Sequence, residues 1–199
     1  MIGRVHKIAG NCIEVHTPEG VLRSTFRGKL RHERQALLKL AAVGDEVEVT
    51  ASGSGEGVID KVLPARSRLS RHDVLRPSVE QVIVANVDLL FVVHSAKDPD
   101  FNPLVVDKCT VMAAANKLPL VLVVNKTDLG SPDLSVYEGS GYRCLRTSTV
   151  TGEGVEALRA LLPGRTSVFF GPSGVGKSSL LNALTPGLGL KTGDVSRHG

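Results

Sequence analysis

The sequence is poor in aromatic residues, in cysteine and in long apolar runs. Its 199 residues include no tryptophan, two tyrosines, five phenylalanines and three cysteines. Cys12, Cys109 and Cys144 are odd in number and share no short spacing, so neither a disulfide framework nor a zinc site is expected. The longest apolar stretch, residues 118–124, is about a third of a membrane-spanning helix, and the first residues lack the apolar core of a secretory signal. We therefore expect a protein of the reducing cytoplasm without membrane contact.

The positive charge is concentrated in the first part of the chain. The formal net charge is +4, and residues 1–78 contain 13 Lys and Arg against 9 Asp and Glu. Residues 79–199 contain 11 of each sign. A length of 199 residues allows one large domain or two small ones. The charge distribution favours a basic module, 1–78, followed by a neutral module, 79–199.

The basic module has the pattern of a small β-barrel. Short segments rich in β-branched residues, separated by turn residues, predict strands at 3–8, 12–16, 21–26, 46–51 and 58–63. The segment 33–42 has the periodicity of a short amphipathic helix. Glycines at 52–57 lie between two strands and indicate a hairpin tip rather than a nucleotide loop. Five strands with a helix before the fourth predict an OB-fold barrel, and the Arg- and Ser-rich segment 64–77 predicts a linker.

The neutral module has a different periodicity. Nearly continuous apolar runs at 87–93, 120–124 and 167–170 are typical of parallel strands covered on both faces. Asn102 and Pro103 are a good N-cap and first-turn pair for a helix ending near residue 116. Further helices are predicted at 155–162 and 177–184. Strands alternating with helices indicate an α/β layered domain.

One segment of this module matches a phosphate-binding loop over its full length. Residues 171–178 fit the pattern G-x-x-x-x-G-K-[ST] between a predicted strand and a predicted helix. Such a loop turns backbone N–H groups toward an anion at a helix N-terminus. Lys177 is expected to reach the β- and γ-phosphates, and the Ser178 hydroxyl to ligate Mg²⁺. The alternative is a glycine-rich turn before a core helix. The predicted phosphate contacts are Gly171, Pro172, Ser173, Gly174, Val175, Gly176, Lys177, Ser178 and Ser179.

A second motif predicts which base is bound. Asn125, Lys126, Thr127 and Asp128 directly follow the strand 120–124. A single carboxylate, here Asp128, can accept both N1–H and N2–H₂ of guanine, whereas adenine would leave it unpaired at a cost of about 1–3 kcal/mol or more. Asn125 could bond the other edge of the base and tie this loop to the phosphate loop, while the Lys126 stem covers the ring. The alternative is an ordinary helix start.

A third loop completes the predicted base site. Residues 147–149, Thr-Ser-Thr, follow the strand-like segment 143–146. This loop resembles the serine-containing loop whose backbone N–H groups meet the guanine carbonyl in GTPases, which makes Ser148 and Thr149 base-binding candidates.

The base-reading motif precedes the phosphate loop, the reverse of its usual order, and circular permutation of a parallel sheet explains the reversal. The chain resembles the circularly permuted ribosome-assembly GTPases of the RsgA (YjeQ) type. The resemblance rests on residues 27–29, 43–47, 85–88 and 99–102, on the Asn125 motif and on the phosphate loop through Ser179. It implies a monomeric GTP-hydrolysing factor for late maturation of the small ribosomal subunit. It also implies an OB domain that docks on the 30S particle and its 16S rRNA, and GTPase activity stimulated by that particle.

The chain departs from that family after the phosphate loop. Members of the family continue with a switch threonine, a D-x-x-G loop and a zinc domain, whereas this sequence extends 21 residues beyond Ser178 and has no Asp followed by Gly three positions later. We therefore expect the GTPase domain, 79–199, to be incomplete at its C-terminus. The catalytic residues and any Zn²⁺ ligands are expected beyond Gly199.

The basic residues of the first module are candidates for RNA contact. Phosphate binding by an OB barrel is one interpretation and a solvated basic face is the other. The candidates are Arg23, Arg27, Lys29, Arg31 and Arg34.

Two rival functions stay open at this point. A P-loop kinase or ATPase of a metabolite would require adenine binding, against which Asp128 argues. An RNA-binding OB module could instead use its nucleotide domain as a switch that binds GTP or GDP without hydrolysing GTP.

Overall fold

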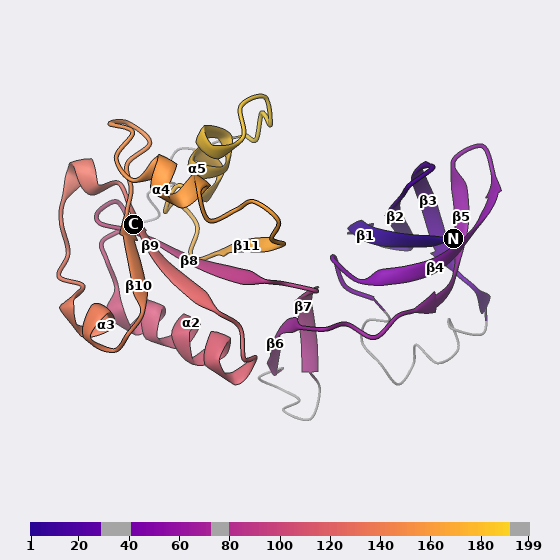
Figure 1. The fold of residues 1–199 in the computed structure, drawn as a ribbon, viewed down its shortest axis with the longest axis horizontal. Helices are drawn as coiled ribbons and strands as arrows, with labels where there is room; N and C mark the ends of the chain where they lie inside the picture. The colour runs from indigo at the N-terminus through magenta and orange to yellow at the C-terminus, as the bar shows by residue number, and fades with distance from the viewer. Residues whose placement is uncertain (29–40, 73–79, 192–199) are drawn as a thin grey trace. The chain divides into compact units, whose positions relative to one another are not determined.

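The computed structural model describes residues 1–28, 41–72 and 80–191 (Figure 1). Contacts divide the chain into two compact units, Met1–Val87 and Asp88–Gly199. The sequence-based boundary after residue 78 falls outside the described ranges, and it stays a prediction. Among the described residues no helix combines the length and the apolar character needed to cross a membrane.

The first unit contains a closed five-stranded barrel. Its strands are β1 (Ile2–Ala9), β2 (Cys12–Thr17), β3 (Gly20–Phe26), β4 (Glu46–Gly53) and β5 (Glu56–Val62). They close in the order β1-β2-β3-β5-β4, with β3 and β5 parallel and the other pairs antiparallel. The predicted OB-type barrel is thereby confirmed. The helix predicted at 33–42 lies almost wholly outside the described residues.

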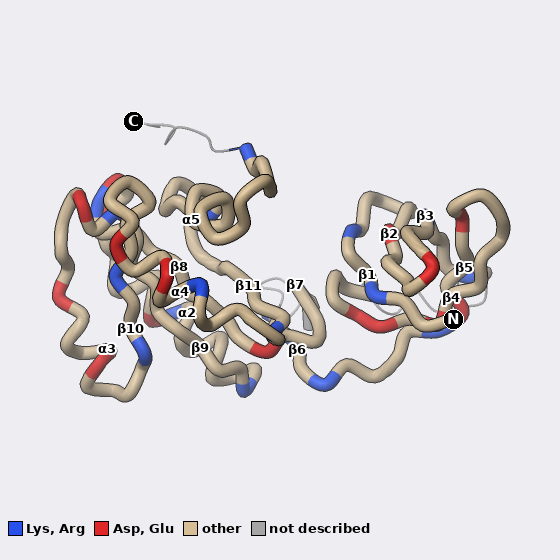
Figure 2. Tube along the Cα trace, turned by 45° about the horizontal axis from the view of Figure 1, so that its top comes forward, with Lys and Arg blue, Asp and Glu red and all other residues tan. Residues whose placement is uncertain are grey.

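Alternating apolar residues fill the barrel. Val5 on β1, Val15 on β2, Val47 and Val49 on β4, and Ile59 on β5 are each at most 1% exposed. Because side chains alternate between the two faces of a strand, every second residue points into the barrel and the residues between them point outward. The outer positions are thus left for polar and charged residues, and Figure 2 shows residues of both charge signs along the chain of the barrel.

A two-stranded hairpin follows the barrel and corrects the predicted linker. β6 (Arg68–His72) pairs antiparallel with β7 (Glu80–Ala85), although the segment 64–77 was predicted to connect domains. The Arg- and Ser-rich composition of this segment does not indicate a strand, although Leu69 of β6 is fully buried. The hairpin is tied to the barrel chain, since Ala85 N–H donates to the Val43 carbonyl at 2.9 Å.

The second unit is built on a four-stranded parallel sheet. β8 (Leu89–Ser95), β9 (Leu120–Asn125), β10 (Arg143–Arg146) and β11 (Ser167–Phe170) lie in the order β10-β9-β8-β11. All three pairings are parallel. The predicted α/β domain with permuted motif order is confirmed, because the last strand in sequence pairs with the first strand of this sheet.

Helices cover both faces of the sheet. α2 (Pro103–Ala115) lies on one face, and α4 (Val155–Arg159) and α5 (Lys177–Leu184) lie on the other (Figure 1). The remaining elements are the 3₁₀ helix η1 (Thr127–Leu129) and α3 (Ser135–Gly139), neither of which was predicted.

One helix prediction is confirmed and another needs correction. α2 has Asn102 at its N-cap and a proline in its first turn, as predicted, although the Asn102 side chain makes no capping hydrogen bond. α4 ends at Arg159 rather than at residue 162. Leu161 and Leu162 instead donate to carbonyls three residues earlier, Leu158 and Arg159, because the chain tightens into a turn ahead of Pro163.

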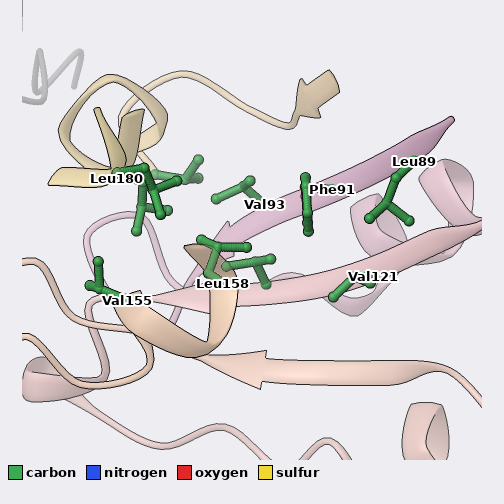
Figure 3. Close-up of a cluster of buried hydrophobic side chains, with 10 residues drawn as sticks. Leu89, Phe91, Val93, Val121, Val155, Leu158 and Leu180 are labelled. Carbon is green, nitrogen blue, oxygen red and sulfur yellow. The ribbon is translucent and has the colours of Figure 1, made fainter. Parts of the chain in front are cut away.

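The core between the sheet and α4 and α5 holds the nucleotide-loop segment in place. Figure 3 shows Leu89, Phe91 and Val93 in a row along β8, in one cluster with side chains of the two helices. Leu158 of α4 and Leu180 of α5 are fully buried in the same cluster. Val175, which belongs to the predicted phosphate loop, is also fully buried there. The loop is therefore anchored in the core rather than free at the surface.

Candidate nucleotide-binding site

Four loops emerge at one edge of the sheet of the second unit. Because β8, β9, β10 and β11 are parallel, their C-terminal ends lie at the same edge. Ligands of open α/β sheets bind at this edge. The segments that leave it begin at residues 96, 126, 147 and 171, and the last three are the loops that the sequence predicted to bind a nucleotide.

The loop between β11 and α5 has the geometry of an anion-binding loop, and its backbone packs closely against β8. A Cβ on Gly171 would lie 2.0 Å from the Val93 carbonyl oxygen, so no other residue fits there without moving β8. Gly176, at the N-cap of α5, has φ +89°. The first turn of α5 contains no acidic residue. Its N–H groups thus face the edge of the sheet without a competing carboxylate nearby on the helix, which suits a phosphate.

Lys177 lies across this loop. Its ammonium donates hydrogen bonds to the carbonyls of Gly171, at 3.0 Å, and Pro172, at 2.5 Å. Burial lowers the pKa of Lys177 below its usual value. A phosphate entering the loop would supply the negative charge that these two neutral carbonyls only partly replace. The donors and the cradle therefore fit the phosphates of a nucleotide.

Asn125 joins the base loop to the phosphate loop. Its side chain is 1% exposed, and its Nδ2 donates to the Val175 carbonyl at 3.0 Å. Its Oδ1 accepts a hydrogen bond from the Thr147 hydroxyl at 3.2 Å. A Cβ on Gly176 would lie 2.3 Å from the Asn125 Nδ2, so the glycine makes room for the amide. The three loops are thus connected through one buried side chain.

Asp128 is an exposed residue of η1, and one oxygen of its carboxylate accepts a hydrogen bond from a neighbouring loop. Ser148, which is fully buried, donates its hydroxyl to Asp128 Oδ1 at 2.5 Å. The same hydroxyl oxygen accepts the N–H groups of Val150 and Thr151, each at 3.2 Å. These bonds orient the Ser148 hydroxyl, and through it they orient the Asp128 carboxylate. The sequence did not indicate this side-chain role, because the resemblance to GTPases assigned Ser148 only a backbone contact.

Thr127 and Glu153 close the base loop from the outside. The Thr127 hydroxyl lies 3.1 Å from the Thr147 carbonyl and 2.6 Å from Glu153 Oε2. Ser148 N–H donates to the Glu153 carbonyl at 3.0 Å. Glu153 was not a sequence candidate, because an exposed glutamate in a glycine-rich turn carries no signal of its own.

Metal binding rests on few side chains. Ser178, at the second position of α5, presents the hydroxyl that a nucleotide-bound Mg²⁺ would use. Within residues 1–28, 41–72 and 80–191, no group of three or more His, Cys, Asp or Glu side chains is placed to hold a metal ion. The predicted zinc ligands belonged to a segment beyond Gly199.

The basic candidates of the barrel are only partly described. Lys29, Arg31 and Arg34 lie outside the described residues. Arg27, with its side chain 59% exposed, pairs with Asp60 at 2.6 Å. The hydrogen bond from the Thr50 hydroxyl lowers the pKa of the Asp60 carboxyl most, and the contact with Arg27 lowers it further. An RNA contact through Arg23 and Arg27 stays a prediction.

Together these features define a class: a P-loop nucleotide domain with its base loop placed before its phosphate loop, preceded by an OB-type barrel. The model of the RsgA GTPase family matches residues 62–199. The chain belongs to the RsgA GTPase family.

Curated relatives and solved structures agree with this assignment. The small ribosomal subunit biogenesis GTPase RsgA of Gemmatimonas aurantiaca is 42% identical over 98% of this chain and 66% of its own length. The protein of the same name from Moorella thermoacetica is 38% identical, over 100% of this chain and 65% of its own. The crystal structure of YjeQ from Thermotoga maritima matches with a TM-score of 0.71 and 37% identity, over 96% of this chain and 66% of that one. YloQ, described as a circularly permuted GTPase, matches with a TM-score of 0.65 and 27% identity, over 93% of this chain and 64% of that one. The chain therefore spans just under two thirds of these relatives' length.

Proposed function

We propose that the second unit binds GTP and GDP with Mg²⁺. The observation that supports this most strongly is the pair of contacts around the base loop: Asn125 bonds to Val175 of the phosphate loop, and Ser148 orients Asp128. A carboxylate held in this way accepts the paired N–H donors of guanine, and adenine lacks them. Lys177 and the first turn of α5 take the phosphates, and Ser178 contributes one ligand to Mg²⁺.

The contacts proposed for the nucleotide are those predicted from the sequence. Asn125, Lys126, Thr127, Asp128, Ser148 and Thr149 take the base, and residues 171–179 take the phosphates. Competition measurements with GDP and ADP on the wild-type protein test this choice of base. We expect a preference for GDP of at least about a hundredfold, because a site built for hydrogen bonds rejects an analogue that leaves them unpaired. Equal affinities for GDP and ADP would favour the rival function, a P-loop kinase or ATPase of a metabolite.

We further propose that the protein hydrolyses GTP and thereby assists late maturation of the small ribosomal subunit. The support is the name shared by the curated relatives, small ribosomal subunit biogenesis GTPase. The proposal extends to contact of the barrel with the 30S particle and its 16S rRNA, to a cytoplasmic location and to a monomeric state.

The alternative is a switch that binds guanine nucleotides without hydrolysing GTP. It is favoured for residues 1–199 on their own, because none of their Asp residues begins a D-x-x-G sequence. Loss of single charge-stabilising donors typically lowers a rate by about 10²–10³.

Phosphate release from residues 1–199, with and without 30S particles, tests whether these residues hydrolyse GTP on their own. The full-length RsgA of Gemmatimonas aurantiaca serves as the positive control. We expect no release above background from residues 1–199 and particle-stimulated release from the control. Stimulated turnover by residues 1–199 would mean that the catalytic residues lie within them and that the switch alternative is wrong.

A further inference from the structure

The loop that follows β8 holds Lys126. Ala96 N–H donates to the Asn125 carbonyl at 2.8 Å, which continues the β8–β9 pairing past the end of both strands. Two residues later the Asp98 carbonyl accepts a hydrogen bond from the Lys126 ammonium. This loop is therefore the fourth segment at the edge of the sheet where the three predicted loops meet.

Lys126 runs from the base loop across the phosphate loop to reach that carbonyl. Its backbone has φ +60°, which turns the residue away from the direction of β9. A Cβ built on Gly176 would lie 4.0 Å from Lys126 Cε, so the end of the aliphatic stem passes near this glycine. The stem is thus fixed at both ends, at its own backbone and at the Asp98 carbonyl.

The position of the Asp98 carbonyl depends on Ser95. Ser95 is fully buried, and its hydroxyl donates to the Pro99 carbonyl at 2.6 Å, closing the turn that contains Asp98. Its N–H donates to Nδ1 of His94 at 2.9 Å. The far side of the turn is packed as well, because Phe101 meets the His94 ring edge-on with ring centroids 5.3 Å apart.

We propose that Ser95 is a positioning residue for the guanine base. Its hydroxyl fixes the turn from 95 to 99, the turn presents the Asp98 carbonyl to the Lys126 ammonium, and the anchored Lys126 stem covers the base. This inference rests on the proposed guanine-nucleotide function. It adds the segment 95–99 to the base site, although none of its side chains is assigned a contact with the nucleotide.

The direct test is the affinity of Ser95→Ala for GDP and GTP by isothermal titration. One uncompensated hydrogen bond corresponds to roughly a three- to tenfold loss. We expect a loss of that size for both nucleotides by the same factor, because the affected contact is at the base and not at the γ-phosphate. Ser95→Thr retains the hydroxyl and should recover most of the affinity.

Lys126→Met distinguishes positioning from a general structural effect. Methionine keeps an apolar stem and removes the ammonium, so the Asp98 carbonyl no longer has a partner to hold. If Ser95 acts through Lys126, adding Ser95→Ala to Lys126→Met should change the affinity by less than about twofold. The matched control is Ser67→Ala, which also loses a serine hydroxyl bond of 2.6 Å, to the Val87 carbonyl of the first unit. We expect that control to leave nucleotide affinity unchanged.

The outcomes separate the inference from the function on which it rests. No preference of the wild-type protein for GDP over ADP would overturn the proposed function and this inference with it. A clear preference in the wild type, with Ser95→Ala unchanged, would overturn the inference alone. Equal losses from Ser95→Ala in the wild-type and Lys126→Met backgrounds would also overturn it, since the effect would then bypass Lys126.

Discussion

The side-chain amide of Asn125 donates to the backbone carbonyl of Val175, 50 positions later in the chain, at 3.0 Å. Both residues are buried, and Val175 is part of the hydrophobic cluster beneath α5. The end of the site that would read a base and the end that would hold phosphates are therefore parts of one rigid arrangement. The contact therefore joins two segments that are far apart in the sequence, and the base loop precedes the phosphate loop, which is the reverse of the usual order.

Replacing Asn125 by Ala should weaken both folding and nucleotide binding. The change leaves the Val175 carbonyl and the Thr147 hydroxyl without this partner, and each buried unsatisfied group costs about 1–3 kcal/mol. We expect the free energy of unfolding in urea to fall by about 2–4 kcal/mol and GDP affinity to fall with it.

The matched control is Asn116→Ala at the end of α2. The Asn116 amide also donates to a backbone carbonyl, that of Met112, at 2.8 Å. Its replacement should lower the free energy of unfolding by about 1 kcal/mol without changing GDP affinity. An Asn125 variant as stable and as tightly binding as this control would contradict the connecting role of Asn125.

Acidification should destabilise the barrel through His6. The rings of His6 and His16 stack with centroids 3.6 Å apart. Burial, then the nearby His16 and Arg4, lower the pKa of His6 below its usual 6.5, against an opposing effect of Glu14. The unfolded chain consequently binds more protons than the folded one in this range. The stabilisation is complete above pH 6.5 and is lost as the pH falls through the folded-state pKa of His6.

Titration of the His6 ring by NMR checks this directly. We expect a midpoint below 6.5, and a shallower fall of unfolding free energy between about pH 7 and 5 in His6→Gln. Burial lowers the pKa of His94 too, so part of the slope should remain in that variant. A His6 midpoint at or above 6.5 would contradict the prediction.

Most of the fold and the outline of the site were predictable because their signals are local. The strand that enters residues 171–178 is a short apolar run and the helix that leaves them is amphipathic, and α5 begins and ends at the predicted residues, Lys177 and Leu184. Strand β6 was not predictable in the same way. Its residues are charged or polar apart from Leu69, and its pairing with β7 depends on partners further along the chain.

The supporting contacts of the site could not be read from the sequence for a related reason. Ser95 and Glu153 belong to no motif, and they become informative only when the parallel register places their loops at one edge. Ser148 was a candidate from the sequence, but the bond from its hydroxyl to Asp128 required the geometry of two loops that are 20 positions apart.

Binding of the barrel to RNA should depend strongly on salt. Phosphate contacts release counterions, so the affinity of residues 1–199 for structured rRNA should fall steeply as salt rises. Neutralising Arg27, Lys29 and Arg31 together, each to Gln, should reduce the slope of log affinity against log salt by about one for each phosphate that is no longer neutralised. Nucleotide affinity should not change.

Three exposed cations of the second unit provide the control for that experiment. Changing Lys108, Lys117 and Arg143 to Gln removes the same charge and should leave the slope nearly unaltered. If both triple variants lower the slope equally, net charge alone explains the binding and the candidate RNA contacts of the barrel are wrong.

Asp128 is the residue proposed to read guanine, and one substitution tests that role most directly. Asp128→Asn exchanges an acceptor for an amide, which can meet the 2-carbonyl of xanthine but not the 2-amino group of guanine. We predict that GDP affinity falls by at least about a hundredfold and that xanthosine diphosphate becomes the preferred ligand, both measured by titration calorimetry on the folded variant. An Asp128→Asn protein that still binds GDP more tightly than xanthosine diphosphate would contradict the assignment of this site.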